Sequence, residues 1–379
     1  MKRIPSLFIL IVTTLTLHAV DIDRQALATD VFSGEQDQFH CQGIAYDEKE
    51  DCFYMSFTTS LVKTDRQGCL LGSVVGLTGH LGCMSLDSET RRLYASNEYK
   101  HDAIGKGIQS ALGDQNSQET GFYIAIFDID RITRPGMKAE EVMKTVYIAE
   151  AVKDYNAQVT NRGKTVEHRF GCSGIDGVAV APANGKKGGK KFLYVAYGIY
   201  GDNDRADNDY QVILCYDINK WNRYAQPLSP QNLHHSGPQK PHKKYFVYTG
   251  NTNWGIQNLN YDPHTGYLLA ACYKGKKEEW GNFDLYAINL NNKARKEILH
   301  GVDTPQKALV LPLSDKGIQG PTKGEHGWRF PYGSTGLNSL GNGLFYISEE
   351  GKNKDTKRQY THIHLYRWTG RPEQPFERL

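Results

Sequence analysis

A short pattern recurs five times along the 379-residue chain and limits the folds that it can adopt. Each copy is a glycine followed by an apolar-rich strand, and the clearest is CSGIDGVAV at residues 172–180; the others lie at 42–47, 81–87, 254–260 and 335–340. Each is followed by a second strand rich in tyrosine and small apolar residues, at 53–56, 93–96, 193–196, 268–271 and 345–348. Five copies of one strand pair predict a fold of radial repeats, in which glycine relieves the crowding of innermost strands around an axis.

Further strands extend each pair. The first four repeats each have a predicted third and fourth strand, in chain order at 61–65 and 69–75, at 122–128 and 145–148, at 211–217 and 245–248, and at 283–288 and 308–311. The fifth repeat ends with a predicted strand at 362–366. Helical periodicity is scarce, and only residues 138–144 are predicted to form a short helix. The chain after residue 19 is therefore interpreted as one all-β domain with five repeats, and a ring of six stays open.

The repeats resemble those of the β-propeller superfamily over residues 26–379, and their number resembles its five-bladed members. Closed propellers often complete the last blade with a strand from the other terminus, which removes an open sheet edge. The resemblance therefore implies that the lone strand at 26–32 pairs beside the strand at 362–366.

The N-terminus has the features of a secretory signal peptide. Lys2 and Arg3 precede a mostly apolar run from residue 4 to 17, and Ala19 supplies a small residue for cleavage. The run is short for a membrane span, although an uncleaved anchor stays open, and no other stretch is apolar enough to cross a membrane. We expect cleavage near Ala19 and a secreted or periplasmic mature protein.

The charge balance argues against nucleic-acid binding. The chain has 45 Lys and Arg against 42 Asp and Glu, a formal net charge of +3, which gives no bulk attraction to a polyanion. The basic runs at 186–191 and 274–277 are interrupted by glycine and are interpreted as exposed loop tips.

Seven cysteines are present, and none forms a CxxC metal-binding pair. Cys52 and Cys69 are symmetric about a hairpin predicted near residues 60 and 61. We therefore expect them to face each other across two strands and to form a disulfide.

Long loops between second and third strands are predicted to wall a funnel over the central channel, because such loops lie on one face of a propeller. Polar residues collect in these loops and on the innermost strands. The predicted catalytic residues are Asp176, Glu98, His80, His168 and Glu349, and the predicted substrate-binding residues are His40, Gln257, Asn258, Asn338, Trp254 and His326. Imidazoles beside carboxylates supply general acids and bases, or ligands for a divalent metal. Each of these residues could instead serve as an ordinary structural hydrogen-bonding group or as buried core.

A second candidate site is the run at residues 201–209. Asp202, Asp204 and Asp207 offer oxygen ligands suited to calcium, although the spacing is not that of an EF-hand, and a solvated acidic turn is the alternative.

The chain lacks a G-x-S-x-G elbow, a Walker sequence, an H-E-x-x-H motif and a dinucleotide fingerprint, which disfavours those chemistries. Propellers include glycoside hydrolases, lactonase-like and phosphatase-like metal enzymes, and lectins, so the fold alone does not fix a function. We expect an exported hydrolase or lyase acting on a saccharide or similar polar metabolite in the funnel, with a divalent metal such as calcium as a conceivable cofactor. The alternative is a non-catalytic propeller that binds a glycan or a protein.

Overall fold

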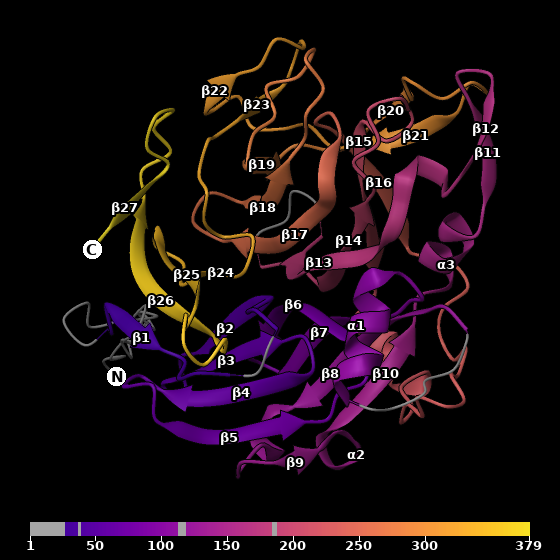
Figure 1. The fold of residues 1–379 in the computed structure, drawn as a ribbon. Coiled ribbons are helices and arrows are strands. Elements are labelled where there is room, and N and C mark those ends of the chain that lie inside the picture. The colour runs from indigo at the N-terminus through magenta and orange to yellow at the C-terminus, as the bar shows by residue number, and fades with distance from the viewer. Residues whose placement is uncertain (1–26, 37–38, 113–118, 184–187) are drawn as a thin grey trace, which may run out of the picture.

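A computed structural model describes residues 27–36, 39–112, 119–183 and 188–379. The predicted signal peptide and Lys186 and Lys187 lie outside these residues. Five antiparallel sheets stand in a ring around a central axis (Figure 1), which confirms the predicted five-bladed β-propeller. The innermost strands contact one another in the cyclic order β2, β6, β13, β17, β24 and back to β2.

The first two blades follow the predicted four-strand pattern. Blade one consists of β2 (Gly43–Asp47), β3 (Cys52–Phe57), β4 (Ser60–Asp65) and β5 (Leu70–Val75), with β9 (Met137–Lys138) paired in parallel on its outer edge. Blade two consists of β6 (His80–Asp87), β7 (Arg92–Tyr99), β8 (Gly121–Asp128) and β10 (Met143–Tyr147).

The remaining blades vary in their outer strands. Blade three consists of β13 (Cys172–Pro182), β14 (Lys191–Ile199), β15 (Tyr210–Tyr216) and β16 (Lys243–Tyr248), extended by β21 (Lys307–Val310) and β20 (Arg295–Ile298). Blade four consists of β17 (Thr252–Asp262), β18 (Tyr267–Lys274) and β19 (Leu285–Asn289). Blade five consists of β24 (Leu337–Ser339), β25 (Leu344–Lys352), β26 (Gln359–Trp368), β1 (Asp30–Phe32) and β27 (Phe376–Arg378).

Short elements decorate the ring. The helices are α1 (Ala103–Leu112), α2 (Ala139–Val142) and α3 (Ala149–Tyr155), and three 3₁₀ turns cover Ile129–Arg131, Arg169–Gly171 and Ile218–Arg223. Two hairpins pair β11 (Gln158–Asn161) with β12 (Lys164–Glu167), and β22 (Ile318–Gln319) with β23 (His326–Gly327). The predicted helix at 138–144 is thus confirmed only over α2. Among the described residues, no helix has the length and apolar character needed to span a bilayer.

The hydrophobic core is divided among the blade junctions. In the described residues, five buried clusters each join two neighbouring blades, including the pair formed by the last and the first blade. Burial of apolar surface between blades therefore holds the ring together along its whole circumference.

The predicted closure is confirmed over residues 30–32, a shorter strand than the one expected at 26–32, whose first residue lies outside the described residues. Strand β1 pairs antiparallel with β26, with Val31 opposite Ile363, and both side chains are buried in the cluster between blades five and one. The N-terminal strand therefore covers the outer edge of the last blade.

The prediction that residues 308–311 form the last strand of blade four is wrong. Strand β21 instead pairs in parallel with β16 of blade three, with Tyr245 opposite Leu309. The segment that follows does run along β19, where Asn289 donates its backbone N–H to the Pro312 carbonyl and Ile288 bridges Leu313. Proline has no N–H to continue a ladder, so blade four keeps an irregular outer edge.

The predicted disulfide is also wrong. Cys52 lies opposite Asp65 in the β3–β4 pair, whereas Cys69 follows a second turn through Gly68 and bonds to Asp65 from its other side. Two strand spacings of about 4.8 Å then separate the cysteines, more than a disulfide can span. Both are free thiols; Cys52 is buried and Cys69 is exposed.

Candidate active site

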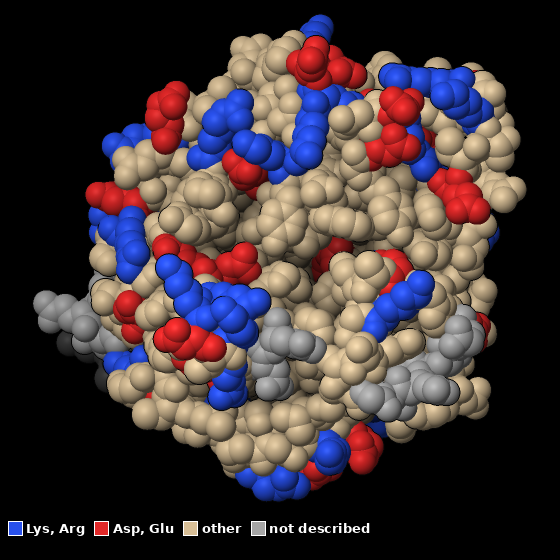
Figure 2. Space-filling model, viewed as in Figure 1, with Lys and Arg blue, Asp and Glu red and all other residues tan. Residues whose placement is uncertain are grey.

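A cavity of about 320 Å³ opens at the centre of the ring, and we call it the axial cavity. Its lining comes from the inner strands and from the loops above them: Phe39, His40, Gln42, Thr58, His80, Glu98, Lys100, Ala103, Ile104, Gly107, Ser173, Asp176, Trp254, Gln257 and Tyr273. Figure 2 shows a hollow near the middle of this face with acidic atoms inside it. The predicted long loop after β7 contributes helix α1 to the wall.

Six of the predicted site residues come together here: His40, His80, Glu98, Asp176, Trp254 and Gln257. The first of these, His40, contacts the Gln42 side chain over 3.1 Å between nitrogens. Burial lowers the pKa of His40, a shift that Glu350 opposes and His80 reinforces. His40 is therefore a neutral imidazole near pH 7 and can accept or donate a hydrogen bond at the cavity wall.

Two carboxylates, Glu98 and Asp176, lie at the base of the axial cavity and approach His80. One ligand atom from each of these three residues lies within 4.8 Å of the others, a spacing that would also suit a divalent cation. The Nδ1 atom of His80 is 3.6 Å from Oε2 of Glu98 and is buried without a hydrogen-bond partner. This nitrogen is left available to hydrogen-bond a water molecule or a ligand.

The carboxylate of Glu98 is held in its ionised form. Its Oε1 accepts the backbone N–H of Ile175 at 2.6 Å, and its Oε2 lies 2.8 Å from the ammonium of Lys100. Burial alone would raise the pKa of Glu98, but Lys100 and His80 outweigh it and hold that pKa below its ordinary value. Lys100 also donates to the Ser173 carbonyl at 2.9 Å, and its carboxylate neighbours raise its pKa despite burial.

The carboxyl group of Asp176 differs from that of Glu98, because its pKa is raised. Burial, followed by the nearby Glu98 carboxylate, raises the pKa of Asp176 to about 7, although Lys100, His80 and a hydrogen bond from Gln257 oppose the shift. The side chain is only partly exposed, and it faces the axial cavity. The surroundings therefore push the pKa values of these two neighbouring carboxyl groups in opposite directions.

Irregular backbone presents these side chains to the axial cavity. The β13–β14 register shifts between Ile175 and Val178, and the β17–β18 register shifts between Ile256 and Asn258, so Asp176 and Gln257 sit in bulges. Trp254 has a positive φ of 70°, which is strained for a bulky residue, and its ring is 37% exposed beside the axial cavity.

The repeat glycine of blade three makes room for the site. Gly174 has a φ of 131°, and a Cβ atom there would overlap Oε1 of Glu98. The glycine that marks the repeat therefore also allows the Glu98 carboxylate to reach the inner strand.

The other predicted residues lie elsewhere among the described residues, and whether any of them acts on a ligand stays a prediction. His168 packs on Tyr155 at the outer end of α3, with its Nδ1 2.6 Å from the Tyr155 carbonyl. Asn258 donates to the Gln42 and Ser334 carbonyls and so ties loops of blades one and five to blade four.

Three more predicted residues lie in blade five or at the outer rim. Asn338 accepts the backbone N–H of Tyr46 at 3.3 Å and does not join Asp176 and Gln257. Glu349 accepts the hydroxyl of Tyr366 at 2.6 Å, and His326 lies in the short strand β23 beside a different cavity.

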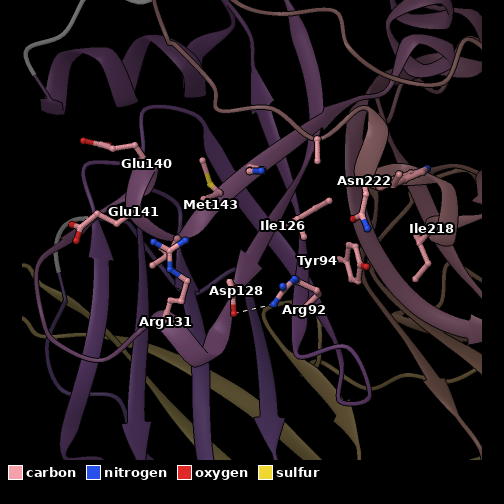
Figure 3. A pocket seen from close by; sticks show the side chains of 14 residues that line it. Arg92, Tyr94, Ile126, Asp128, Arg131, Glu140, Glu141, Met143, Ile218 and Asn222 are labelled. Carbon is pink, nitrogen blue, oxygen red and sulfur yellow. Dashed lines mark ion pairs between the residues drawn. The ribbon is translucent and has the colours of Figure 1, made fainter.

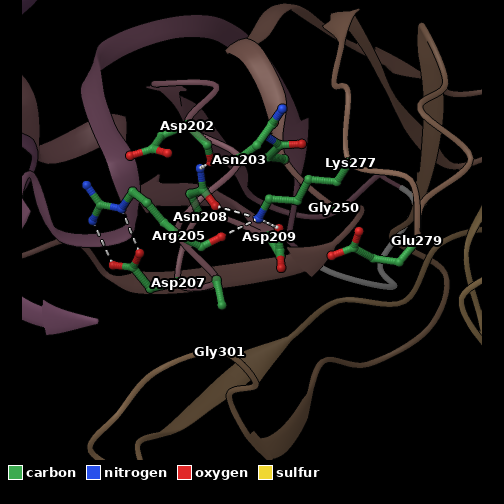
Figure 4. Close-up of polar contacts among 12 residues, drawn as sticks. Asp202, Asn203, Arg205, Asp207, Asn208, Asp209, Gly250, Lys277, Glu279 and Gly301 are labelled. Atoms are coloured by element: carbon green, nitrogen blue, oxygen red, sulfur yellow. Dashed lines mark hydrogen bonds and ion pairs between the residues drawn. The ribbon is translucent and has the colours of Figure 1, made fainter. Parts of the chain in front are cut away.

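The candidate calcium run forms an ion-pair network instead of a clear ligand cage (Figure 4). Arg205 lies 2.9 Å from both carboxylate oxygens of Asp207, and Asp202 accepts the backbone N–H of Asp204 at 2.8 Å. Lys277 is buried and bonds to Asn208 and Asp209, so the interpretation of Lys277 as an exposed loop tip is wrong. Calcium binding by the three aspartates stays a prediction.

A second cavity, of about 290 Å³, lies at the outer edge of blade two beside the 3₁₀ turn at Ile218–Arg223 (Figure 3). An ion pair of 2.9 Å joins Arg92 to Asp128 on its wall. None of the predicted site residues lines it.

Sequence reasoning missed Lys100 and Tyr273. Lys100 follows Glu98 by two residues and lies directly after the last residue of β7, and alternation along an extended chain puts such residues on one side. That spacing was the available signal for an ion pair.

No protein-family model matches the chain, and a search of curated proteins finds no match. Solved structures with similar folds include a calcium-containing carbohydrate-active enzyme of family AA12 from Trichoderma reesei, at 10% identity and a TM-score of 0.38 over 85% of this chain and 80% of that one. They also include the RRP9 WD40 repeats, at 10% identity and a TM-score of 0.35 over 93% of this chain and 83% of that one. A third is the calcium-binding protein regucalcin from Agrobacterium tumefaciens, at 11% identity and a TM-score of 0.33 over 93% of this chain and 98% of that one. Similarity at this level assigns no function, and the strand pairing identifies the chain as a five-bladed β-propeller.

Proposed function

We propose that the protein is a hydrolase or lyase that acts on a saccharide or a similar polar metabolite in the axial cavity. The observation that carries the proposal is the pairing of Asp176 with Glu98. Two adjacent carboxyl groups line one cavity, and Lys100 compensates the charge of only one of them, Glu98, directly. Such asymmetry is typical of general acid–base catalysis.

The surrounding residues have compatible roles. Asp176 serves as the proton donor, because it is partly protonated near neutral pH. Ionised Glu98 favours the protonated form of the neighbouring Asp176, and His80 lies within reach of the same space. The exposed ring of Trp254 provides an apolar surface against which a sugar ring can stack.

A bound metal ion is not required by this proposal. The ligand atoms of His80, Glu98 and Asp176 would fit a divalent cation, but the ammonium of Lys100 already compensates Glu98. Metal analysis of the purified protein distinguishes a metal-free mechanism from a metal-assisted one. If a metal such as calcium is bound, it would supply Lewis-acid chemistry at the same residues.

The alternative function is non-catalytic binding of a glycan or a protein. The 37% exposed Trp254 at the mouth of the axial cavity favours this reading, because an exposed aromatic ring is also typical of binding sites. Binding that survives Asp176→Asn without any turnover would support it.

The test is a screen of glycosides, polysaccharides, lactones and phosphate esters with the purified mature protein. Asp176→Asn and Glu98→Gln should abolish turnover of any substrate found, whereas Asp315→Asn, an exposed carboxylate outside the axial cavity, should not. Equal turnover in Asp176→Asn and the parent protein would refute the proposed role of the site.

We also propose that the protein is exported and cleaved near Ala19. The support is the sequence pattern of residues 1–19 alone. Intact mass and N-terminal sequencing of the protein from its native host should give a mature chain that begins close to Val20.

A further inference from the structure

Three side chains meet where the N-terminal strand closes the ring, and we call them the seam cluster: Asp30 from β1, and His362 and His364 from β26. Asp30 lies opposite His364 and Phe32 lies opposite His362 in the antiparallel register. The two histidines are separated by two positions on one strand, so both face the same side of the sheet.

The geometry of the seam cluster matches a set of metal ligands. Nδ1 of His362 is 2.9 Å from Oδ1 of Asp30, and Nδ1 of His364 is 3.8 Å from Oδ2 of Asp30. The two imidazole rings are nearly parallel, with an interplanar angle of 9° and centroids 5.7 Å apart. Ligand atoms around tetrahedral zinc, at 2.0–2.1 Å from the ion, are about 3.3 Å apart. One ligand atom from each of the three residues lies within 4.8 Å of the others, so the side chains would move slightly closer together around an ion.

We propose that the seam cluster binds one divalent transition metal ion, of which zinc fits best, and that this ion fastens the N-terminal strand to the last blade. Two imidazoles and one carboxylate form a ligand set suited to zinc. Asp30 and His362 are about half and one-third exposed, so the ion can enter from solvent and keep a water as its fourth ligand. His364 is buried and anchors the site.

A carboxylate stands behind the buried ligand. Oε2 of Glu349 is 3.8 Å from Nε2 of His364, the ring nitrogen that faces away from Asp30, and Tyr366 holds Glu349 by a hydrogen bond of 2.6 Å. Metal-ligating histidines commonly donate their second ring N–H to such a carboxylate, which fixes the ring and its tautomer. At 3.8 Å the two groups attract each other without a hydrogen bond, and we expect Glu349 to accept the Nε2–H of His364 and to orient its ring once the ion binds.

Arg378 competes with the ion. Its guanidinium donates to Nδ1 of His364 at 2.8 Å and lies 3.7 Å from Oε1 of Glu349, so in the structure it occupies a ligand atom. Its side chain is half exposed on the short strand β27 and can turn outward. The metal ion and Arg378 therefore exclude each other at His364, and removal of Arg378 should strengthen metal binding.

The experiment is calorimetric titration of untagged, chelator-treated protein with zinc, together with thermal unfolding. We expect one ion per chain, and at a zinc concentration 100 times the Kd a rise in Tm of about 4 °C. Asp30→Asn is the variant that should disturb folding least, since the Asp30 side chain is about half exposed to solvent. It should weaken zinc affinity by at least tenfold. His362→Gln should do the same, Glu349→Gln should weaken affinity by about 10–100-fold, and Arg378→Gln should strengthen it.

Controls separate this site from others. His264→Gln removes an exposed histidine in a turn of blade four and should leave zinc affinity unchanged. Cobalt(II) in place of zinc should give tetrahedral absorption bands that Asp30→Asn abolishes. Absence of binding, or affinity that is lost in Asp176→Asn but kept in Asp30→Asn, would overturn the proposal, and the latter result would place the ion in the axial cavity.

Discussion

Gln257 donates its side-chain amide to Oδ2 of Asp176 over 3.2 Å, so a hydrogen bond joins the inner strands of blades three and four inside the axial cavity. The same amide also reaches the Trp254 carbonyl at 2.9 Å. Gln257 therefore positions the carboxyl group for which we propose a proton-transfer role and ties it to the strained residue at the cavity mouth.

The first prediction concerns Asp176→Asn. The amide keeps the shape of the side chain and an oxygen that accepts from Gln257, so near pH 4, where folded Asp176 is also neutral, the Tm should change little. If Asp176 transfers a proton, kcat should fall by about 10²–10⁴-fold. Steady-state kinetics on the first substrate identified checks the loss, and circular dichroism of the same preparation checks the fold.

The second prediction concerns the pH dependence of stability. The pKa of Asp176 is raised from an ordinary 3.8 to about 7, so between these pH values the folded protein binds a proton that the unfolded chain has lost. The contribution of Asp176 to the free energy of unfolding is therefore fully present below about pH 4 and is lost as the pH rises toward 7. The Tm of Asp176→Asn relative to the parent should be higher at pH 8 than at pH 5, and a constant difference across this range would contradict the prediction.

The third prediction concerns Lys100. Lys100→Met leaves Glu98 buried without its ammonium partner, which should cost about 3–5 kcal/mol of unfolding free energy. The double variant with Glu98→Gln removes the stranded charge and should recover part of the loss. Urea unfolding measures both, and Lys276→Met, at an exposed position, should be close to neutral.

The fourth prediction concerns ring closure. Val31 is buried between blades five and one, so Val31→Ala should lower the free energy of unfolding by about 2 kcal/mol. Leu70→Ala, at a position 52% exposed on the outer strand of blade one, should change it by less than about 0.5 kcal/mol. Equal effects of the two substitutions in denaturant titrations would argue against a structural role for β1.

The fifth prediction concerns thiol reactivity. All seven cysteines are free, and of these only Cys69 is exposed. Burial raises the pKa of Cys52 to about 11, which further lowers its reactivity. Native protein should therefore react rapidly with one equivalent of a thiol reagent at Cys69, and mass spectrometry should find no bridge between Cys52 and Cys69.

The blade count and the inner strands could be predicted because each inner strand has a repeat glycine at or near its start, where neighbouring strands crowd the axis. At Gly43, for example, a Cβ would lie 2.9 Å from Cα of Cys83 in the neighbouring blade. The pattern of a glycine and its strand involves only neighbouring residues and occurs five times in the chain, so it can be recognised from the sequence. The assignment of β21 to blade three depends instead on pairing between distant segments, which periodicity cannot specify.

The candidate site was predictable in part for the same reason. Asp176, Glu98 and His80 stand next to repeat positions, so equivalent places in the blades indicated that they converge. Asn338, predicted to bind substrate, does not line the axial cavity, and β24 carries no register shift like those that turn Asp176 and Gln257 into it. A bulge alters which way a side chain points, and no sequence repeat records it.

The pairing of Asp30 with His362 brings together residues that are 332 positions apart. Contacts of such sequence separation form slowly, because the entropy of closing a long loop must be lost before the contact contributes. During synthesis the edge of β26 stays open until the end of the chain emerges, while β1 has already been made. We therefore expect closure of the ring to be the last step of folding, and the fully assembled but unclosed chain to be the species most prone to pair with another molecule.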